Sequence, residues 1–200
     1  MPLEIELKLA LPPAALAATL AHPLIKAAPL EHEPTRLDSI YYDTPDLALH
    51  AHRVALRVRQ HGTQQIQTVK CAARSHGGLA QRPEWEQSYQ DQFDFSAIDN
   101  PEAAALLESV KTALVPVFLT CFQRDTRRYT PRAGVEILIM IDSGEIQAQG
   151  RAIPISEVEL ELVAGEPEDL VRLAAELQKT LPLTPDDVSK AQRGYELCHA

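Results

Sequence analysis

The chain has 200 residues, 45% of them apolar, which is enough for one well-packed domain over residues 1–200. Its formal net charge of −9 argues against binding of nucleic acid or of an anionic membrane through the overall field, while a local basic pocket is compatible with it. We find no signal-peptide pattern and no run of about 18 apolar residues. The three cysteines lie far apart in the sequence, and we expect a cytoplasmic protein with unpaired thiols and no membrane partner.

Turn and helix-start residues divide the chain into short segments. A predicted strand at residues 4–9 precedes a helix at 13–21, strands at 35–43, 54–60, 66–70 and 81–89, and a helix that begins at Asn100 and Pro101. Strands at 118–130, 135–142, 145–149 and 155–163 follow, with a turn expected at Ser143 and Gly144, and then a helix at Pro167–Lys179. Many strands and few helices indicate an α+β fold with an antiparallel sheet or barrel.

Each predicted strand has one polar face, because side chains alternate between the two faces of a sheet. The polar faces carry Glu4, Glu6 and Lys8; Arg57 and Arg59; Thr68 and Lys70; Arg82, Glu84 and Glu86; Arg124, Thr126 and Arg128; Asp142; and Glu157, Glu159 and Glu161. A solvated face of a half-buried sheet explains any single row. For the whole set, like charges along one strand and separate acidic and basic strands favour a closed barrel, with charges inside and helices packed outside.

The basic rows predict a ligand with many anionic oxygens, since guanidinium groups match phosphate through paired hydrogen bonds. Facing carboxylates would repel such a ligand unless a hard divalent cation lay between the two. A polyphosphate compound together with Mg²⁺ or Mn²⁺ satisfies both walls of the predicted tunnel.

The segment EIELK at residues 4–8 resembles the ExExK signature of the CYTH domain, the module of the triphosphate tunnel metalloenzymes. The resemblance continues in family order over nearly the whole chain, at YYDTPDLAL (41–49), LRVR (56–59), TVK (68–70), GGLAQRPEWE (77–86), EVELEL (157–162) and SKAQRGY (189–195). The GGLxQRPE and SKAxRGY forms are most similar to the bacterial inorganic triphosphatases, in which a helical CHAD domain often follows the CYTH domain. The resemblance implies a tunnel of roughly eight antiparallel strands.

The resemblance also implies roles for single residues. It implies Mg²⁺ or Mn²⁺ ligands at Glu4, Glu6, Glu159 and Glu161, with Asp142 on the metal side and Glu157 as a further or outer ligand. It implies phosphate binding by Lys8, Arg57, Arg59, Lys70, Arg124, Lys190 and Arg193, to which strand parity adds Arg128. Thr126 stands where the family resemblance implies a second basic residue beside Arg124. Glu4 and Lys8 lie where the attacking water would be positioned.

The implied activity is metal-dependent hydrolysis of inorganic triphosphate (tripolyphosphate) to pyrophosphate and phosphate. One alternative is action on a nucleotide or thiamine triphosphate, including adenylate cyclase chemistry, in the same tunnel. Another is a polyphosphate-binding module without catalysis that tethers a CHAD domain or another partner. The many carboxylates argue against the last alternative, because they would weaken simple anion binding.

Overall fold

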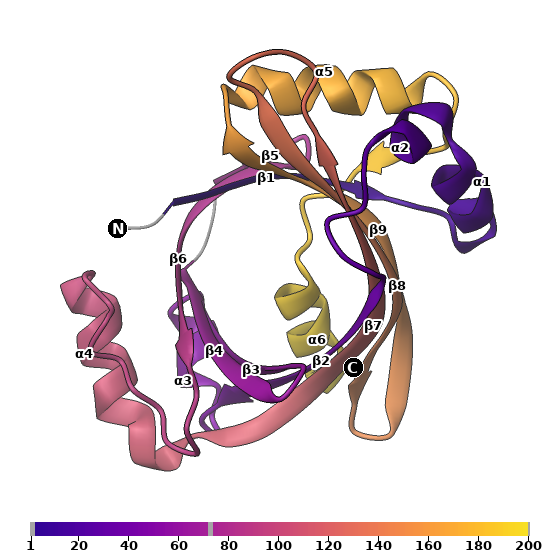
Figure 1. The fold of residues 1–200 in the computed structure, drawn as a ribbon. Helices are drawn as coiled ribbons and strands as arrows, with labels where there is room; N and C mark the ends of the chain where they lie inside the picture. Colours follow the sequence, from indigo (N-terminus) through magenta and orange to yellow (C-terminus); the bar gives the residue numbers. More distant parts are fainter. Residues whose placement is uncertain (1–2, 72–73, 200) are drawn as a thin grey trace.

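Eight strands pair edge to edge in a closed antiparallel barrel in the computed structural model, which describes residues 3–71 and 74–199 (Figure 1). Around the barrel they are β1 (Leu3–Ala10), β9 (Arg151–Ala164), β8 (Glu136–Ala148), β7 (Val115–Tyr129), β2 (Thr35–Asp43), β3 (Val54–His61), β4 (Gln64–Cys71) and β6 (Leu79–Ser88), and β6 pairs with β1 to close the ring. The short strands β5 (Arg74–His76) and β10 (Thr184–Pro185) pair with β6 and β1. The predicted α+β barrel of about eight strands is confirmed.

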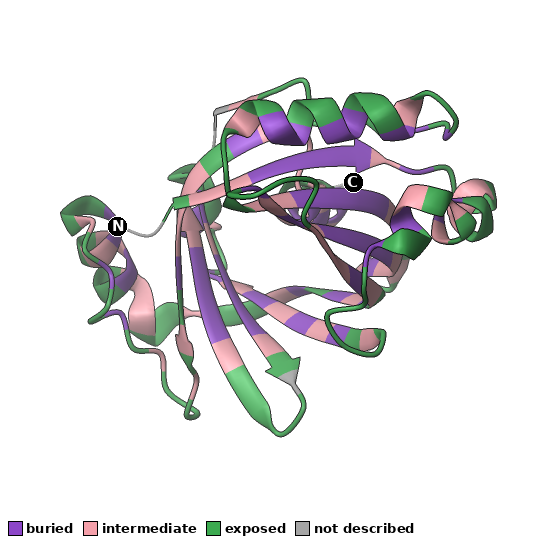
Figure 2. Cartoon of the chain, turned by 45° about the horizontal axis from the view of Figure 1, so that its top comes forward, coloured by how far each residue is buried: buried purple, intermediate pink, exposed green. Residues whose placement is uncertain are grey.

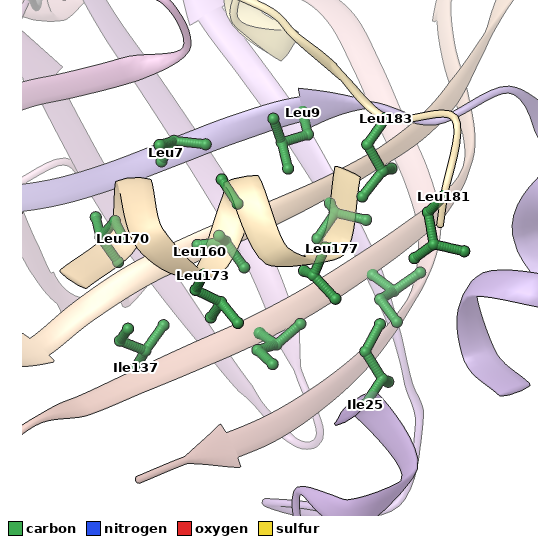
Figure 3. Packing of buried hydrophobic residues seen from close by; sticks show 14 of the residues in the cluster. Leu7, Leu9, Ile25, Ile137, Leu160, Leu170, Leu173, Leu177, Leu181 and Leu183 are labelled. Carbon is green, nitrogen blue, oxygen red and sulfur yellow. The ribbon is translucent and has the colours of Figure 1, made fainter. Parts of the chain in front are cut away.

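Helix α5 (Pro167–Gln178) covers β1, β8 and β9 from outside the barrel (Figure 1). Its buried leucines pack on outward side chains of the strands, such as Leu9 and Leu160, both 0% exposed (Figure 3). Figure 2 shows the result, with buried and exposed positions alternating along this helix. The strand residues that face α5 are the apolar partners of the charged rows, so burying them turns the charges toward the inside of the barrel.

The other outer helices are short. They are η1 (Pro13–Ala15), α1 (Leu16–Ala21) and α2 (Pro23–Ala27) beside the first core, and α3 (Ala48–Ala51), α4 (Pro101–Val110) and η2 (Lys111–Ala113). A second outer core joins α3 and α4 to β3, β4 and β6, and it contains Trp85 and Leu107. Helix α4 begins where predicted, since the Asn100 side chain accepts hydrogen bonds from the backbone of Glu102 and Ala103.

Helix α6 (Lys190–His199) lies inside the barrel wall (Figure 1). Tyr195 and Leu197 are buried against Phe118 and Phe122 of β7, and a Cβ atom at Gly194 would lie 2.2 Å from the Phe118 ring. The helix is close enough to β7 only because residue 194 has no side chain.

The segment that leads into α6 passes beside the seam between β1 and the β5–β6 hairpin. Lys8 donates its backbone N–H to Gly78 O at 2.9 Å, and Asp186 donates its own to Lys8 O at 3.1 Å. Asp187 Oδ1 accepts the backbone N–H of Gly78 at 2.8 Å. These bonds fix the start of α6 to the barrel wall.

The turn expected at Ser143 and Gly144 is wrong, because β8 runs through both residues to Ala148. A Cβ atom at Gly144 would lie 2.1 Å from Cys121 O on the neighbouring strand. The glycine therefore allows a close approach of β7 and β8 within the sheet, rather than a reversal of the chain. None of the helices in the described part of the chain has the length and apolar character needed to cross a membrane.

Candidate functional site

The barrel encloses a cavity of about 710 Å³ lined by charged side chains. Among the residues predicted from the sequence, it is lined by Glu4, Glu6, Lys8, Arg57, Arg59, Lys70, Arg124, Glu159, Glu161 and Lys190. Arg82, Glu84 and Glu86 of β6 line it as well. The structure thus brings side chains from β1, β3, β4, β6, β7, β9 and α6 into one space.

The acidic wall of the cavity is formed by neighbouring strands β1 and β9. Glu6 lies opposite Glu161 in the strand register, and Lys8 lies opposite Glu159. Burial and the negative charge of Glu159 raise the pKa of Glu6 to about 7. Burial and the charge of Glu4 likewise raise the pKa of Glu161, which forms no ion pair with any described residue. This wall carries more negative charge than its neighbours neutralise.

Glu4 lies at the edge of the acidic wall and is held by two cations of the adjoining strands. Lys70 Nζ donates to its carboxylate at 2.9 Å, and Arg82 Nε donates at 2.7 Å. Burial alone would raise the pKa of Glu4, but Lys70 and Arg82 outweigh it and lower the pKa to about 2. Arg82 also pairs with Glu6 through Oε1, while the described residues supply no partner for the other oxygen of Glu6.

The basic wall is formed mainly by β3, β4 and β6. Arg57 lies 3.8 Å from Glu84 and 3.6 Å from Glu86, measured between guanidinium nitrogen and carboxylate oxygen. Lys70 lies 3.1 Å from Glu84, and Thr68 donates a hydrogen bond to Glu86 at 2.9 Å. The cations of this wall are therefore preorganised by acids of the next strand, which limits the side-chain entropy lost when an anion binds.

Arg59 differs from the other arginines of the basic wall. Its Nε donates to Ser39 Oγ at 3.1 Å, and its guanidinium carbon lies 5.9 Å from the centre of the Phe122 ring. No described carboxylate forms an ion pair with it. Burial, followed by the positive charges of Arg57 and Arg124, lowers the pKa of Arg59 to about 9, so that it carries its charge at pH 7. The cavity thus contains an uncompensated cation.

At one side of the cavity, Asp142, Glu157 and Glu159 offer carboxylate oxygens that all lie within 4.8 Å of one another. The ammonium group of Lys190 lies among them, 2.7 Å from Asp142, 2.9 Å from Glu159 and in contact with Glu157. Its nitrogen also lies 5.0 Å from the centre of the Phe122 ring. Burial alone would lower the pKa of Lys190, but the three carboxylates raise it.

Four predicted site residues do not line the cavity. Asp142 and Glu157 are 0% and 1% exposed and lie behind Lys190, and Arg193 lies 3.5 Å from Glu157 and donates to the backbone of Pro154. Arg128 pairs with Glu31 at 2.5 Å and with Glu136. The parity of β7 places Arg128 on the inward face, but its position near the end of the strand takes it away from the cavity.

Other residues line the cavity without a role predicted from the sequence. Met140 is two residues before Asp142 on β8, so strand parity could have identified it. Asp186 lies 3.5 Å from Lys8 Nζ, and its position depends on the path of the chain into α6, for which the sequence has no signal. Arg53 has a φ of 57°, and nothing in the residue pattern predicts this left-handed backbone beside the cavity. Thr126 occupies a position where a basic side chain was expected in the cavity. Neither Arg127, which pairs with Asp125, nor Arg128 lines the cavity in its place.

The chain belongs to the CYTH domain family, whose pattern matches residues 2–195. An inorganic triphosphatase of Haemophilus influenzae is 33% identical over 204 residues, which are 97% of this chain and 54% of that protein. The chain therefore spans about half the length of this curated relative. The predicted family membership is confirmed.

Solved structures share the fold at low sequence identity. One is a Hippeastrum protein named as an adenylyl cyclase and described as having a dominant triphosphatase activity; it is 20% identical, with a TM-score of 0.67 over 96% of this chain and 95% of that one. The PH1819 protein of Pyrococcus horikoshii is 18% identical, with a TM-score of 0.60 over 97% and 99%. At these identities the likeness establishes the barrel and not the reaction.

Proposed function

We propose that this protein is a hydrolase that cleaves inorganic triphosphate (tripolyphosphate) into pyrophosphate and phosphate inside the barrel. The observation that carries the proposal is the uncompensated cation Arg59 in a cavity that also contains Arg57, Lys70 and Arg124. A half-buried charge without an ion-pair partner is costly, and a ligand with several anionic oxygens would relieve that cost. The identity to an inorganic triphosphatase supports the same substrate class.

The carboxylates of the acidic wall fit a divalent cation that would bind together with the substrate. Glu6 and Glu161 face each other on β1 and β9, with only one of their oxygens in a described ion pair. Burial and then the neighbouring carboxylates raise the pKa values of both groups. Oxygen ligands suit Mg²⁺ and Mn²⁺, and Mg²⁺ is commonly held by one or two carboxylates together with substrate phosphate. We assign the cation to Glu6 and Glu161, with Glu4 and Glu159 beside them. When bound, it would neutralise phosphate oxygens and position water.

The basic residues would hold the substrate and stabilise the charge that develops during transfer. Water attacks the terminal phosphorus in line, the bond to the bridging oxygen breaks, and pyrophosphate leaves. Guanidinium groups fixed before the reaction lower the barrier most where charge accumulates, and loss of one such donor costs about 10²–10³ in kcat. Arg57 and Arg59 are the residues to which we assign this role.

Glu4 and Lys8 keep more limited proposed roles. A carboxylate with a pKa of about 2 is a weak proton acceptor at neutral pH, so Glu4 suits the metal side better than it suits proton transfer. Lys8 lines the cavity, while its Nζ donates to Val188 O in the segment that leads into α6. We assign it to substrate binding and to the support of this segment.

The test is phosphate release from tripolyphosphate, ATP and thiamine triphosphate with Mg²⁺, with Mn²⁺ and with excess chelator. Arg57→Ala and Arg59→Ala are compared with Arg36→Ala, whose side chain is 69% exposed on the other face of β2 and pairs with Asp38. We expect chelator-sensitive release from tripolyphosphate, lost in the two cavity variants and kept in the control.

Each contrary result selects an alternative. If phosphate is released faster from ATP or thiamine triphosphate than from tripolyphosphate, the substrate is a triphosphate compound with an organic group. Binding of tripolyphosphate without release from any compound would make the barrel a receptor and remove the catalytic assignments. A cytoplasmic location and a CHAD partner stay predictions.

A further inference from the structure

The three carboxylates that come closest together in the described residues are not arranged around open space. Asp142, Glu157 and Glu159 lie on neighbouring strands β8 and β9, and Asp142 is opposite Glu157 in the register. They are the one group of acids among these residues close enough to surround a metal ion, and the sequence also predicts metal ligands at all three positions. The space between them is filled by Lys190 Nζ of α6.

Lys190 and Arg124 together bind every carboxylate oxygen of this site except Glu157 Oε2. Both oxygens of Asp142 accept from Arg124, at 2.7 and 2.6 Å, and one of them lies 2.7 Å from Lys190 Nζ. Glu159 gives one oxygen to Lys190 at 2.9 Å and the other to Arg124 at 2.5 Å. The face of Phe122 lies near both cations. Two cations thus offset two of the three carboxylate charges, so that at most one negative charge is left to attract a further divalent ion.

A second cation on α6 reinforces the arrangement. Arg193 follows Lys190 by three residues and therefore lies on the same face of the helix. Its Nη1 lies 3.5 Å from Glu157 Oε2, an oxygen with no hydrogen bond from any described group, and it donates to Pro154 O. Both cations of α6 thus face the β8–β9 wall rather than a metal ion.

We propose that Asp142 and Glu157 are positioning residues that hold Lys190, and through it helix α6, inside the barrel, and that they are not metal ligands. Lys190 takes the place that a metal ion would have among Asp142, Glu157 and Glu159. Asp142 orients Arg124 and Lys190, both of which line the cavity, so these acids act on the substrate through the two cations. The metal ion of the proposed reaction is then bound by Glu6 and Glu161 of the acidic wall, while both oxygens of Glu159 are engaged by Lys190 and Arg124.

The decisive experiment removes the ammonium group and counts bound Mn²⁺ by electron paramagnetic resonance, without substrate. Lys190→Met frees the three carboxylates, and we expect it to bind one more Mn²⁺ than the parent protein. The double variant Lys190→Met with Glu157→Gln should lose this additional site. An unchanged Mn²⁺ count in folded Lys190→Met, verified by circular dichroism, would overturn the proposal.

Glu157→Gln alone keeps the inference testable if Lys190→Met does not fold. We expect Mn²⁺ affinity and stoichiometry to stay at the parent level, while hydrogen exchange of the amides of residues 190–199 becomes faster. Loss of one bound Mn²⁺, or an affinity at least about tenfold weaker as expected for a lost ligand, would overturn the proposal.

A kinetic comparison, which rests on the proposed function, separates positioning from a purely structural role. Asp142→Asn should raise KM for tripolyphosphate without changing the Mn²⁺ concentration needed for half activity, whereas Glu161→Gln should raise that concentration. A raised Mn²⁺ requirement in Asp142→Asn would overturn the proposal. Absence of phosphate release by the parent protein would remove the proposed function, while the Mn²⁺ count and hydrogen exchange would still decide the role of Lys190.

Discussion

Arg59 donates a hydrogen bond from Nε to Ser39 Oγ at 3.1 Å and has no ion pair with any described carboxylate. Because an unpaired, half-buried charge opposes folding, we expect Arg59→Met to raise the free energy of unfolding by ~1 kcal/mol, or Tm by about 2–4 °C. The same change should weaken tripolyphosphate binding at least about tenfold, since hydrogen bonds to a charged group are lost. Thermal denaturation and isothermal titration calorimetry measure the two effects.

The control for this prediction is Arg36→Met, which removes the same charge from an exposed position paired with Asp38. We expect neither effect there, because exposed ion pairs contribute little to stability. A lower Tm in Arg59→Met than in the parent protein would contradict the view that Arg59 is retained for ligand binding at a cost in stability.

The pH dependence of anion binding is expected to report the charge of Arg59. Its pKa is lowered to about 9 by burial and by Arg57 and Arg124, so the cation is present at pH 7 and is lost as pH rises through this value. We expect sulfate binding by the metal-free protein to weaken above about pH 9, with the step displaced upward at high sulfate because the bound anion favours the charged form. Sulfate is a suitable probe since its own charge stays constant in this range.

Arg59→Gln is the matched variant for the pH experiment. It should bind sulfate more weakly and without the step near pH 9. If the step persists in this variant, another group causes it and the assignment to Arg59 fails.

Removal of one carboxylate of the acidic wall should change the metal requirement selectively. Glu161→Gln keeps the shape of the side chain and removes a charge that has no described ion-pair partner, and we expect the Mn²⁺ affinity to fall roughly 10–100-fold. Glu86→Gln is the control, because the Glu86 side chain lines the same cavity, is 50% exposed and lies on the basic wall. Equal losses in the two variants, measured by Mn²⁺ titration, would show that general cavity charge and not a ligand position is responsible.

The fit of α6 inside the barrel predicts an unusual response to a change from glycine to alanine. In an isolated helix, Gly194→Ala would stabilise by about 1 kcal/mol through helix propensity. Here the added Cβ would lie 2.2 Å from the Phe118 ring, so we expect a net loss of ~1–3 kcal/mol in the free energy of unfolding.

Urea denaturation measures this loss, and Gln192→Ala, at an exposed position of α6, should change stability by no more than about 0.5 kcal/mol. A more stable Gly194→Ala protein would mean that α6 does not pack against β7 in solution.

Local alternation in the sequence, together with the family motifs, predicted the fold. Period-two patterns placed Glu4, Glu6 and Lys8 on one face of β1, and the same rule placed Trp85 opposite Glu84 and Glu86, where it packs beneath α4. These predictions succeed because side chains of a strand alternate between two faces, and burial of the apolar face is favourable.

Strand parity does not predict how far along the barrel a side chain lies. Arg124 and Arg128 share a face of β7, yet Arg124 lines the cavity while Arg128 pairs with Glu31 and Glu136. The path of a strand around a closed barrel depends on stagger and tilt, which are properties of all strands together.

The sequence by itself determined the alternation of each strand, the family motifs and, through both, a barrel with charges inside. Only the tertiary structure decided which charges neutralise one another. Lys190 lies 33 residues from Glu157 in the chain and meets it because α6 lies inside the barrel. Arg59, on β3, has no carboxylate partner among the described residues. The contrast between the paired Lys190 and the unpaired Arg59 determines where an anion or a metal ion would be stabilised. Pairing across a closed barrel joins residues that are distant in sequence, and their electrostatic energy depends on distances and burial that no local pattern contains.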